Sequence, residues 1–210
     1  VNSGTLTIKN NLNLTGIFEN LGKIFMNGGF INTNAGFSSL TNSSKGEINA
    51  DKAMFTGSRG TVTNNGKISL RYFQNSASFE LTNNCKFYVS EDFINNGTTI
   101  NNSYIEVGRN TQITNTLTLN NGAMFQTKGL QTMTGKIIGM GKKSLFKVIV
   151  PSTYSVSGTF EGNLIFCDSY KHEANKFKSG AVQTCEDNFP IPGCVGEISE
   201  TPIQDKDGDK

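Results

Sequence analysis

Four charged residues of alternating sign recur along the sequence at intervals of 20, 20 and 18 residues: Asp51, Arg71, Glu91 and Arg109. A fifth, Asp92, directly follows Glu91. Carboxylates in such a set can bind Ca²⁺ or exchange protons, and a polysaccharide lyase combines a carboxylate cluster with a basic residue that abstracts a proton. An inverting glycoside hydrolase needs two carboxylates about 6.5 to 9.5 Å apart. If the protein is an enzyme, Asp51, Glu91 and Asp92 are therefore its catalytic candidates.

The arginines in this set favour binding over catalysis. Arg71 falls between Asp51 and Glu91, where its charge would lower the pKa of both carboxyl groups, although a hydrolase needs one pKa raised. The lyase interpretation has the same weakness, because arginines separate the carboxylates that would share a calcium ion. We expect an exposed ladder of salt bridges, each worth less than about 1 kcal/mol. As a binding surface this ladder would consist of Asp51, Arg71, Glu91 and Arg109.

A second set of carboxylates lies at the end of the sequence, where Asp205, Asp207 and Asp209 alternate with Lys206 and Gly208. Alternate aspartates with an intervening glycine are typical of calcium loops, in which each carboxylate oxygen is a hard ligand. No later acidic residue completes the shell in this sequence. The tail therefore predicts either an incomplete calcium site or a solvated linker, and no other cofactor is expected.

Three of the four cysteines, Cys167, Cys185 and Cys194, fall in the last quarter of the sequence, while Cys85 lies far from them. None forms a Cys-x-x-Cys pair, which argues against zinc. We expect one disulfide among the last three, and hence an oxidising compartment. The alternative is a set of free thiols in a reduced cytosolic protein. The single histidine, His172, is expected to be solvated at the surface.

The elements that position these residues are indicated by an internal repeat, of which Asn64-Asn65-Gly66-Lys67-Ile68 is the clearest copy. Its small residue recurs at positions 4, 22, 46, 66, 85, 103 and 122, at intervals of 18 to 24 residues. Apolar residues alternate over short runs between polar corners, which indicates three strands per repeat. Coils stacked about 4.8 Å apart satisfy this pattern. We predict an all-β fold, a right-handed single-stranded parallel β-helix with 18–20 residues per coil.

Two further columns are expected inside the coil. Phenylalanines recur at near-constant offsets from the small residue and should stack: Phe30, Phe55, Phe73 and Phe93. Asparagines two residues before the small residue should form an amide ladder along the axis: Asn64, Asn83, Asn101 and Asn120. Both columns are structural and carry no ligand role.

Three segments follow from this pattern. Residues 1–167 form the β-helix, residues 168–200 an irregular, disulfide-containing C-terminal cap, and residues 201–210 an acidic linker to a further domain. Val1 begins within a repeat, so we expect a chain from which a targeting segment has been removed. A net charge of +2 predicts no nucleic-acid partner, and the lack of an apolar run of about 18 residues predicts no membrane insertion.

The repeats from Val1 to Phe166 resemble those of bacterial surface β-helix proteins, including filamentous-haemagglutinin-like adhesins. The tail from Asp205 to Asp209 looks like the opening of a thrombospondin-type-3-like calcium linker. Together they resemble large exported surface proteins of Bacteroidetes-type bacteria. The resemblance implies an exported module, at the cell surface or extracellular, for attachment or spacing. The sequence departs from the haemagglutinin pattern in its 24-residue second coil and in its cysteine-bearing end.

Three functions remain open at the level of sequence. The first and favoured one is a noncatalytic cell-surface adhesin or scaffold module whose outer face binds an extracellular glycan or a host or matrix protein. The second is a polysaccharide lyase or glycoside hydrolase built on the same coil. The third is a structural stalk without a ligand.

Overall fold

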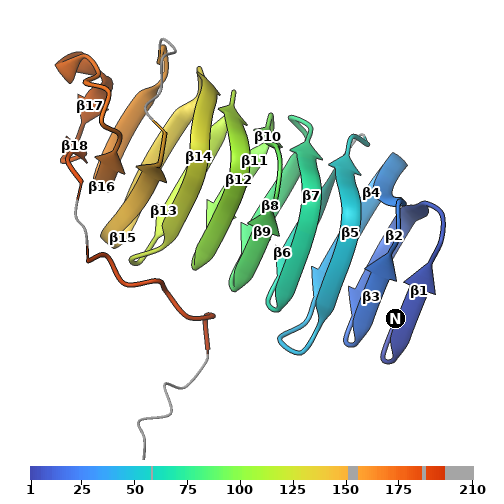
Figure 1. Cartoon of the computed structure of the whole chain (residues 1–210). Helices are drawn as coiled ribbons and strands as arrows, with labels where there is room; N and C mark the ends of the chain where they lie inside the picture. The colour runs from blue at the N-terminus through green and yellow to red at the C-terminus, as the bar shows by residue number, and fades with distance from the viewer. Residues whose placement is uncertain (58, 151–155, 186–187, 197–210) are drawn as a thin grey trace, which may run out of the picture.

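The computed structural model describes residues 1–57, 59–150, 156–185 and 188–196. It is a parallel β-solenoid of about nine turns, and it confirms the predicted parallel β-helix (Figure 1). Short strands at a period near 20 residues place each coil directly against the one before it, so that every strand pairs with its counterparts in the neighbouring coils. The three strands expected in each repeat are present, and they build three faces.

Face A extends along the whole solenoid, from β1 to β18. It consists of short strands and of one half of several longer, bent strands: β1 (Thr5–Ile8), β3 (Lys23–Met26), β9 (Lys86–Val89), β18 (Val182–Gln183), the first halves of β5 (Glu47–Phe55), β7 (Lys67–Asn75), β12 (Tyr104–Ile113) and β14 (Met124–Met133), and the second halves of β15 (Lys136–Val148) and β16 (Thr159–Cys167).

Faces B and C complete each turn. Face B contains β10 (Phe93–Asn95), the second halves of β5, β7, β12 and β14, and the first halves of β2 (Leu12–Asn20) and β4 (Phe30–Asn42). Face C contains β6 (Arg59–Asn64), β8 (Phe79–Asn83), β11 (Thr98–Asn101), β13 (Thr116–Asn120), β17 (Phe177–Lys178) and the remaining halves of β2, β4, β15 and β16.

The interior is filled by the alternate residues of each strand, as period-2 patterning requires. On face A the same inward position stacks through consecutive coils as Ile24, Ile48, Ile68, Phe87, Ile105, Phe125, Phe146 and Phe166, all buried.

The predicted phenylalanine column is correct only for Phe73 and Phe93, which pair in register with ring centroids 4.9 Å apart. Phe55 is buried but lies opposite Asn75, and half-buried Phe30 lies opposite Lys52. Phe55 is displaced because its offset differs by two residues from that of Phe73, and β5 pairs with β7 without a register shift. Phe30 is displaced because the corner between β3 and β4 has two more residues than the bend in β5.

The predicted asparagine ladder exists and is longer than expected at its N-terminal end. Each amide Nδ2 donates to the Oδ1 of the next coil at 2.8 to 2.9 Å, through Asn2, Asn20, Asn42, Asn64, Asn83 and Asn101. The assignment of Asn120 to this ladder was wrong. Asn101 pairs with Leu119, because the corner before Met124 contains two extra residues, and Asn120 instead donates to Asn102.

The glycine of the repeat is required by close packing at this corner. A Cβ atom on Gly66 would clash with the carbonyl oxygens of Ser43 and Gly46, and one on Gly46 would clash with the side chain of Asn42. The buried amides therefore occupy the space that a side chain would need, and glycine and asparagine recur together.

The expected C-terminal cap consists of two parts. Residues 168–183, with the 3-10 helix η1 (Ala174–Lys176), close the end of the coil, where Phe177 stacks on Phe160 at 4.9 Å. His172 belongs to this part and is buried, with Nε2 3.0 Å from Asp168 Oδ2, so the expectation of a solvated histidine was wrong.

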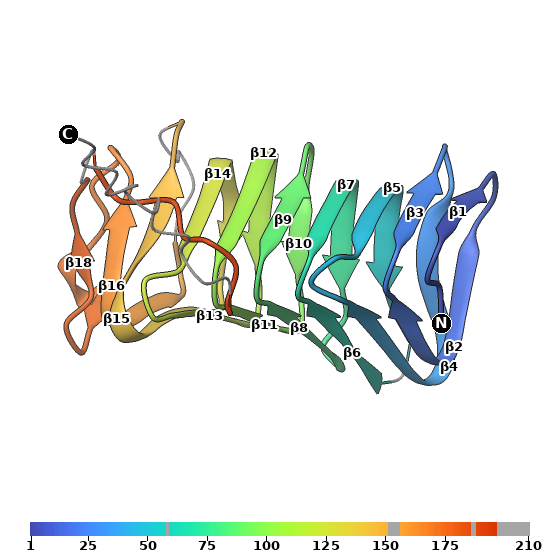
Figure 2. The same ribbon diagram turned by 90° about the horizontal axis from the view of Figure 1, so that it is seen from below.

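The second part, the strap, consists of residues 184–185 and 188–196. The strap turns back and runs along the outside of face A (Figure 2). Four outward side chains are buried beneath it with Phe189 packed against them: Tyr104, Met124, Leu145 and Ile165. Ser103 Oγ donates to Gly193 O at 2.7 Å, and the Val195 amide donates to Asn84 O at 2.7 Å.

Two disulfides hold the strap. Cys167 pairs with Cys185 where the strap begins, which confirms one disulfide among the last three cysteines. Cys194 pairs with Cys85, 109 residues earlier in the sequence. This second pair was not predicted, because Cys85 lies far from the other cysteines in the sequence.

Candidate functional site

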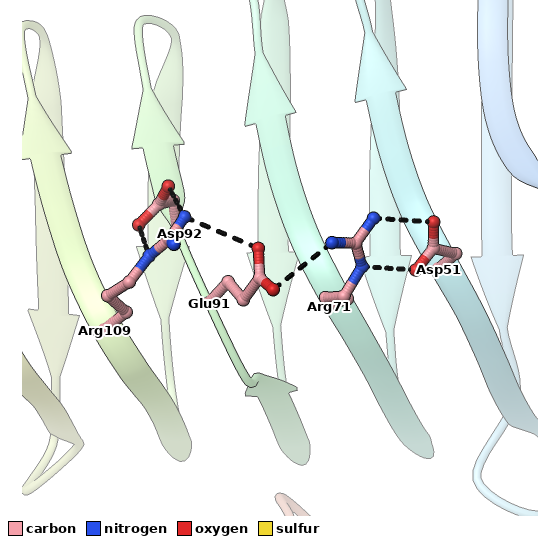
Figure 3. A network of polar contacts seen from close by, with 5 residues as sticks. All are labelled: Asp51, Arg71, Glu91, Asp92 and Arg109. Atoms are coloured by element: carbon pink, nitrogen blue, oxygen red, sulfur yellow. Dashed lines mark hydrogen bonds and ion pairs between the residues drawn. The ribbon is translucent and has the colours of Figure 1, made fainter. Parts of the chain in front are cut away.

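The charged ladder forms at the bend between faces A and B, with its five residues in adjacent coils (Figure 3). Arg71 in β7 donates from Nη2 to Asp51 Oδ2 at 3.0 Å and from Nη1 to Glu91 Oε1 at 3.2 Å. Arg109 in β12 donates from Nε to Asp92 Oδ1 at 2.8 Å and from Nη2 to Glu91 Oε2 at 3.4 Å. Each arginine thus bridges two carboxylates, and the structure brings together the five charged residues of the predicted ladder.

These contacts fix the charges of the ladder. The hydrogen bond from Arg71 holds the pKa of Asp51 below its ordinary value, and the hydrogen bond from Arg109 does the same for Asp92. The carboxylates in turn raise the pKa of both guanidinium groups. Asp51 and Asp92 therefore stay ionised at neutral pH, and neither can donate a proton as a general acid.

A groove of about 640 Å³ runs beside the ladder across five coils, from that of β3 to that of β12. Its hydrogen-bonding wall is the same outward position of face A in successive coils: Asn49, Ser69, Tyr88 and Glu106. Asp51 and Arg71 form part of its other side, and the glycines at positions 28 and 108 leave two places without a side chain. The ladder therefore borders a continuous surface depression.

Tyr88 is one of four groove residues that were not singled out in the sequence, with Asn49, Ser69 and Glu106. Its ring packs against Tyr104 in a T-shaped contact with centroids 6.0 Å apart. Tyr104 lies beneath the strap and donates from Oη to Glu106 Oε2 at 2.9 Å; burial raises its pKa. The strap side of face A thereby fixes the orientation of two groove residues. Counting alternate residues from Lys67 and from Lys86 places Ser69 and Tyr88 at the same outward position of successive coils. This count would have identified Tyr88.

The side chains that could ligate a metal ion are dispersed within the described part of the chain. No group of three or more His, Cys, Asp or Glu side chains that could hold a metal ion occurs there. The calcium candidates Asp205, Asp207 and Asp209 lie outside the described residues, so the calcium prediction stays a prediction. In the described ranges, no helix is long and apolar enough to cross a membrane.

Comparisons of the chain with models of protein families, with curated proteins and with solved structures found no match. The geometry of the groove and its ladder is therefore the basis for assigning a function.

Proposed function

We propose that the protein is a noncatalytic binding module, an adhesin or scaffold unit, that holds an extended glycan in the groove beside the ladder. The observation that carries this proposal is the pairing of all three candidate acids with arginine. Asp51, Glu91 and Asp92 each accept hydrogen bonds from Arg71 or Arg109. Such carboxylates can orient a hydroxyl group, but two of them are held ionised, which disfavours acid catalysis.

The chemistry of the groove fits a carbohydrate. It offers an amide, a hydroxyl, a phenol and a carboxylate from four consecutive coils, and parallel strands repeat these groups about every 4.8 Å. A polymer lying along the solenoid axis would meet an equivalent position at each coil. The edge and face of the Tyr88 ring supply apolar contact for a sugar ring.

The charge of the site favours a neutral or amino-bearing glycan. The ladder holds two arginines and three carboxylates, so its formal charge is 2 − 3 = −1, and Glu106 adds one further negative charge in the groove. A uronate or sulfated chain would be repelled there.

An extracellular position is part of the proposal. Both disulfides join the strap to the coil, Cys194 to Cys85 over 109 residues and Cys185 to Cys167 over 18 residues. Disulfides of this kind persist in oxidising compartments and are rare in the cytosol. Their presence supports export of the protein to the cell surface or beyond.

A glycan array followed by calorimetry tests the proposal. We expect saturable binding of a neutral glycan, weakened about tenfold by Tyr88→Ala and less by Tyr88→Phe, which keeps the ring. Thr118→Ala, half-exposed on face C, is the matched control and should bind as the unchanged protein does.

Two results would overturn the proposal. Production of reducing sugars or unsaturated products that disappears in Glu91→Gln would establish an enzyme. Absence of any saturable ligand on the array would leave the structural stalk.

A further inference from the structure

A second pocket, separate from the groove, lies at the corner between faces C and A. It encloses about 410 Å³ and is bordered by Lys45, Lys67 and Lys86, with the Cys85–Cys194 disulfide as one wall. The corner is rigid, because the buried asparagine ladder runs directly behind it and Gly46 and Gly66 fit closely over the ladder. Its shape is therefore formed before any ligand arrives.

The charges along the rim alternate in sign at first and then depart from that alternation. Lys23, Glu47 and Lys67 are register neighbours of alternating sign, and Glu47 contacts both lysines at 3.5 Å. The next neighbour of Lys67 is Lys86, another lysine. Like charges directly opposite one another on a sheet are destabilising. The ladder at Asp51 shows that this chain elsewhere places a carboxylate between successive cations.

Most of the positive charge here has no ion-pair partner among the described residues. Of these residues, Glu47 alone contributes a carboxylate to the pocket lining, and it is shared by Lys23 and Lys67. Within the described residues, neither Lys45 nor Lys86 forms an ion pair, and both are exposed. With three lysines and one glutamate the formal charge of the pocket is 3 − 1 = +2.

We propose that this pocket binds an oxyanion, a carboxylate or a sulfate group, through Lys45, Lys67 and Lys86. Three ammonium groups around a preformed pocket suit one such group, since each can donate a charge-assisted hydrogen bond to a different oxygen. Two sources can supply it. One is an anionic polysaccharide; the other is the chain itself, whose sequence continues after Gly196 with Glu197 and Glu200.

This site is independent of the groove. Lys67 and Arg71 lie four residues apart on β7, a separation of about 13 Å along an extended strand. The pocket is positive where the groove is negative, so the two select opposite ligands. A variant of one site leaves the other intact, and failure of glycan binding in the groove would not touch this inference.

Calorimetry with a sulfated dextran oligosaccharide, and with unsulfated dextran of equal length as the neutral probe, tests the site. We expect saturable binding of the sulfated probe only. Lys86→Gln and Lys45→Gln should each weaken it about fivefold. Lys128→Gln removes an exposed lysine two coils from Lys86, at the opposite end of face A, and should leave the binding unchanged. Melting temperatures of all variants should match that of the unchanged protein, because these side chains are solvated.

The full-length variant Glu197→Gln/Glu200→Gln distinguishes the two sources. Tighter probe binding in this variant identifies the chain's own carboxylates as the occupant, and unchanged binding identifies an external polymer. Equal weakening by Lys86→Gln and Lys128→Gln would overturn the proposal, because the attraction would then be diffuse. So would the absence of binding in both the unchanged protein and the Glu197→Gln/Glu200→Gln variant.

Discussion

Arg71 and Arg109 determine what the carboxylates beside them can do. Each guanidinium contacts two acidic groups, so the acids of the ladder cannot move independently. The pairs are partly exposed, and pairs of this kind contribute little to stability. Their main effect is therefore on the chemistry of the surface, which becomes a rigid pattern of alternating charge.

The first prediction concerns the titration of Asp51. Its folded-state pKa is below the ordinary value of 3.8 because Arg71 donates hydrogen bonds to the ionised form. The stabilisation that it contributes is present above the unfolded-state pKa and is lost as the pH falls below about 4. Carboxyl NMR titration should show the Asp51 pKa rising toward the ordinary value in Arg71→Gln. Arg59→Gln, outside the ladder, should leave it unchanged; an equal rise there would contradict the local cause.

A second prediction concerns Asn64, which is fully buried. Its side chain accepts from Asn42 Nδ2 and from the Gly66 amide, and donates to Asn83 Oδ1 and Lys86 O. Asn64→Ala leaves these groups without partners in a dry interior, which should cost about 3 kcal/mol of unfolding free energy. Chemical denaturation measures this. Asn65→Ala, at the half-buried position next to it, should cost less than about 1 kcal/mol. Equal losses in the two variants would mean that the buried ladder contributes no more to the unfolding free energy than half-buried Asn65 does.

At the scale of elements, the strap makes the two halves of the coil different from one another. Four outward positions of face A are apolar in the coils that the strap covers, namely Tyr104, Met124, Leu145 and Ile165. The equivalent positions in earlier coils carry charges, at Lys23, Glu47, Lys67 and Lys86. The same column is therefore solvated in one half of the molecule and buried in the other.

The third prediction concerns the two disulfides that hold this element. Cross-linking restricts the unfolded chain more when the closed loop is longer, and the loops here span 109 and 18 residues. Replacing both cysteines of a pair by serine should cost about 5 kcal/mol for Cys85–Cys194 and about 3 kcal/mol for Cys167–Cys185. Loss of the first pair should also raise the fluorescence of a hydrophobic dye, because it frees the strap from the apolar column. Unchanged dye binding would contradict that role.

The coil could be predicted from the sequence, and the strap could not. Period-2 alternation and the recurring corner are local signals, so they were sufficient for the fold class, for the three strands per turn and for the charged ladder. The pairing of Cys85 with Cys194 depends on contacts between distant segments, and cysteine spacing does not encode connectivity. The displaced Asn120 shows a related limit, since two extra residues in one corner shift the register by an amount that a count of intervals cannot reveal.

At the scale of the whole molecule, the solenoid places two sites of opposite charge along one face. The groove lies where face A bends into face B, and the lysine pocket lies where face C bends into face A. The groove ends at the coil of β12, and the lysine pocket lies beside the end of the strap at Cys194. Apart from Cys194, both proposed sites are therefore built from coils that precede β14, while the later coils form the covered end of the solenoid.

This division predicts a gradient of stability along the axis. Among the described residues, the edge strand β1 has one partner, β3, and its inward residues Leu6 and Ile8 are half-buried. β13 pairs with β11 on one side and with β15 on the other, and its inward residues Leu117 and Leu119 are fully buried. Local opening of β1 breaks one set of hydrogen bonds and exposes little new apolar surface. The free energy of opening β1 should therefore be much lower than that of opening β13. Hydrogen exchange followed by mass spectrometry should show β1 exchanging well before β13, whereas equal protection of the two strands would mean that the coil opens only as a single cooperative unit.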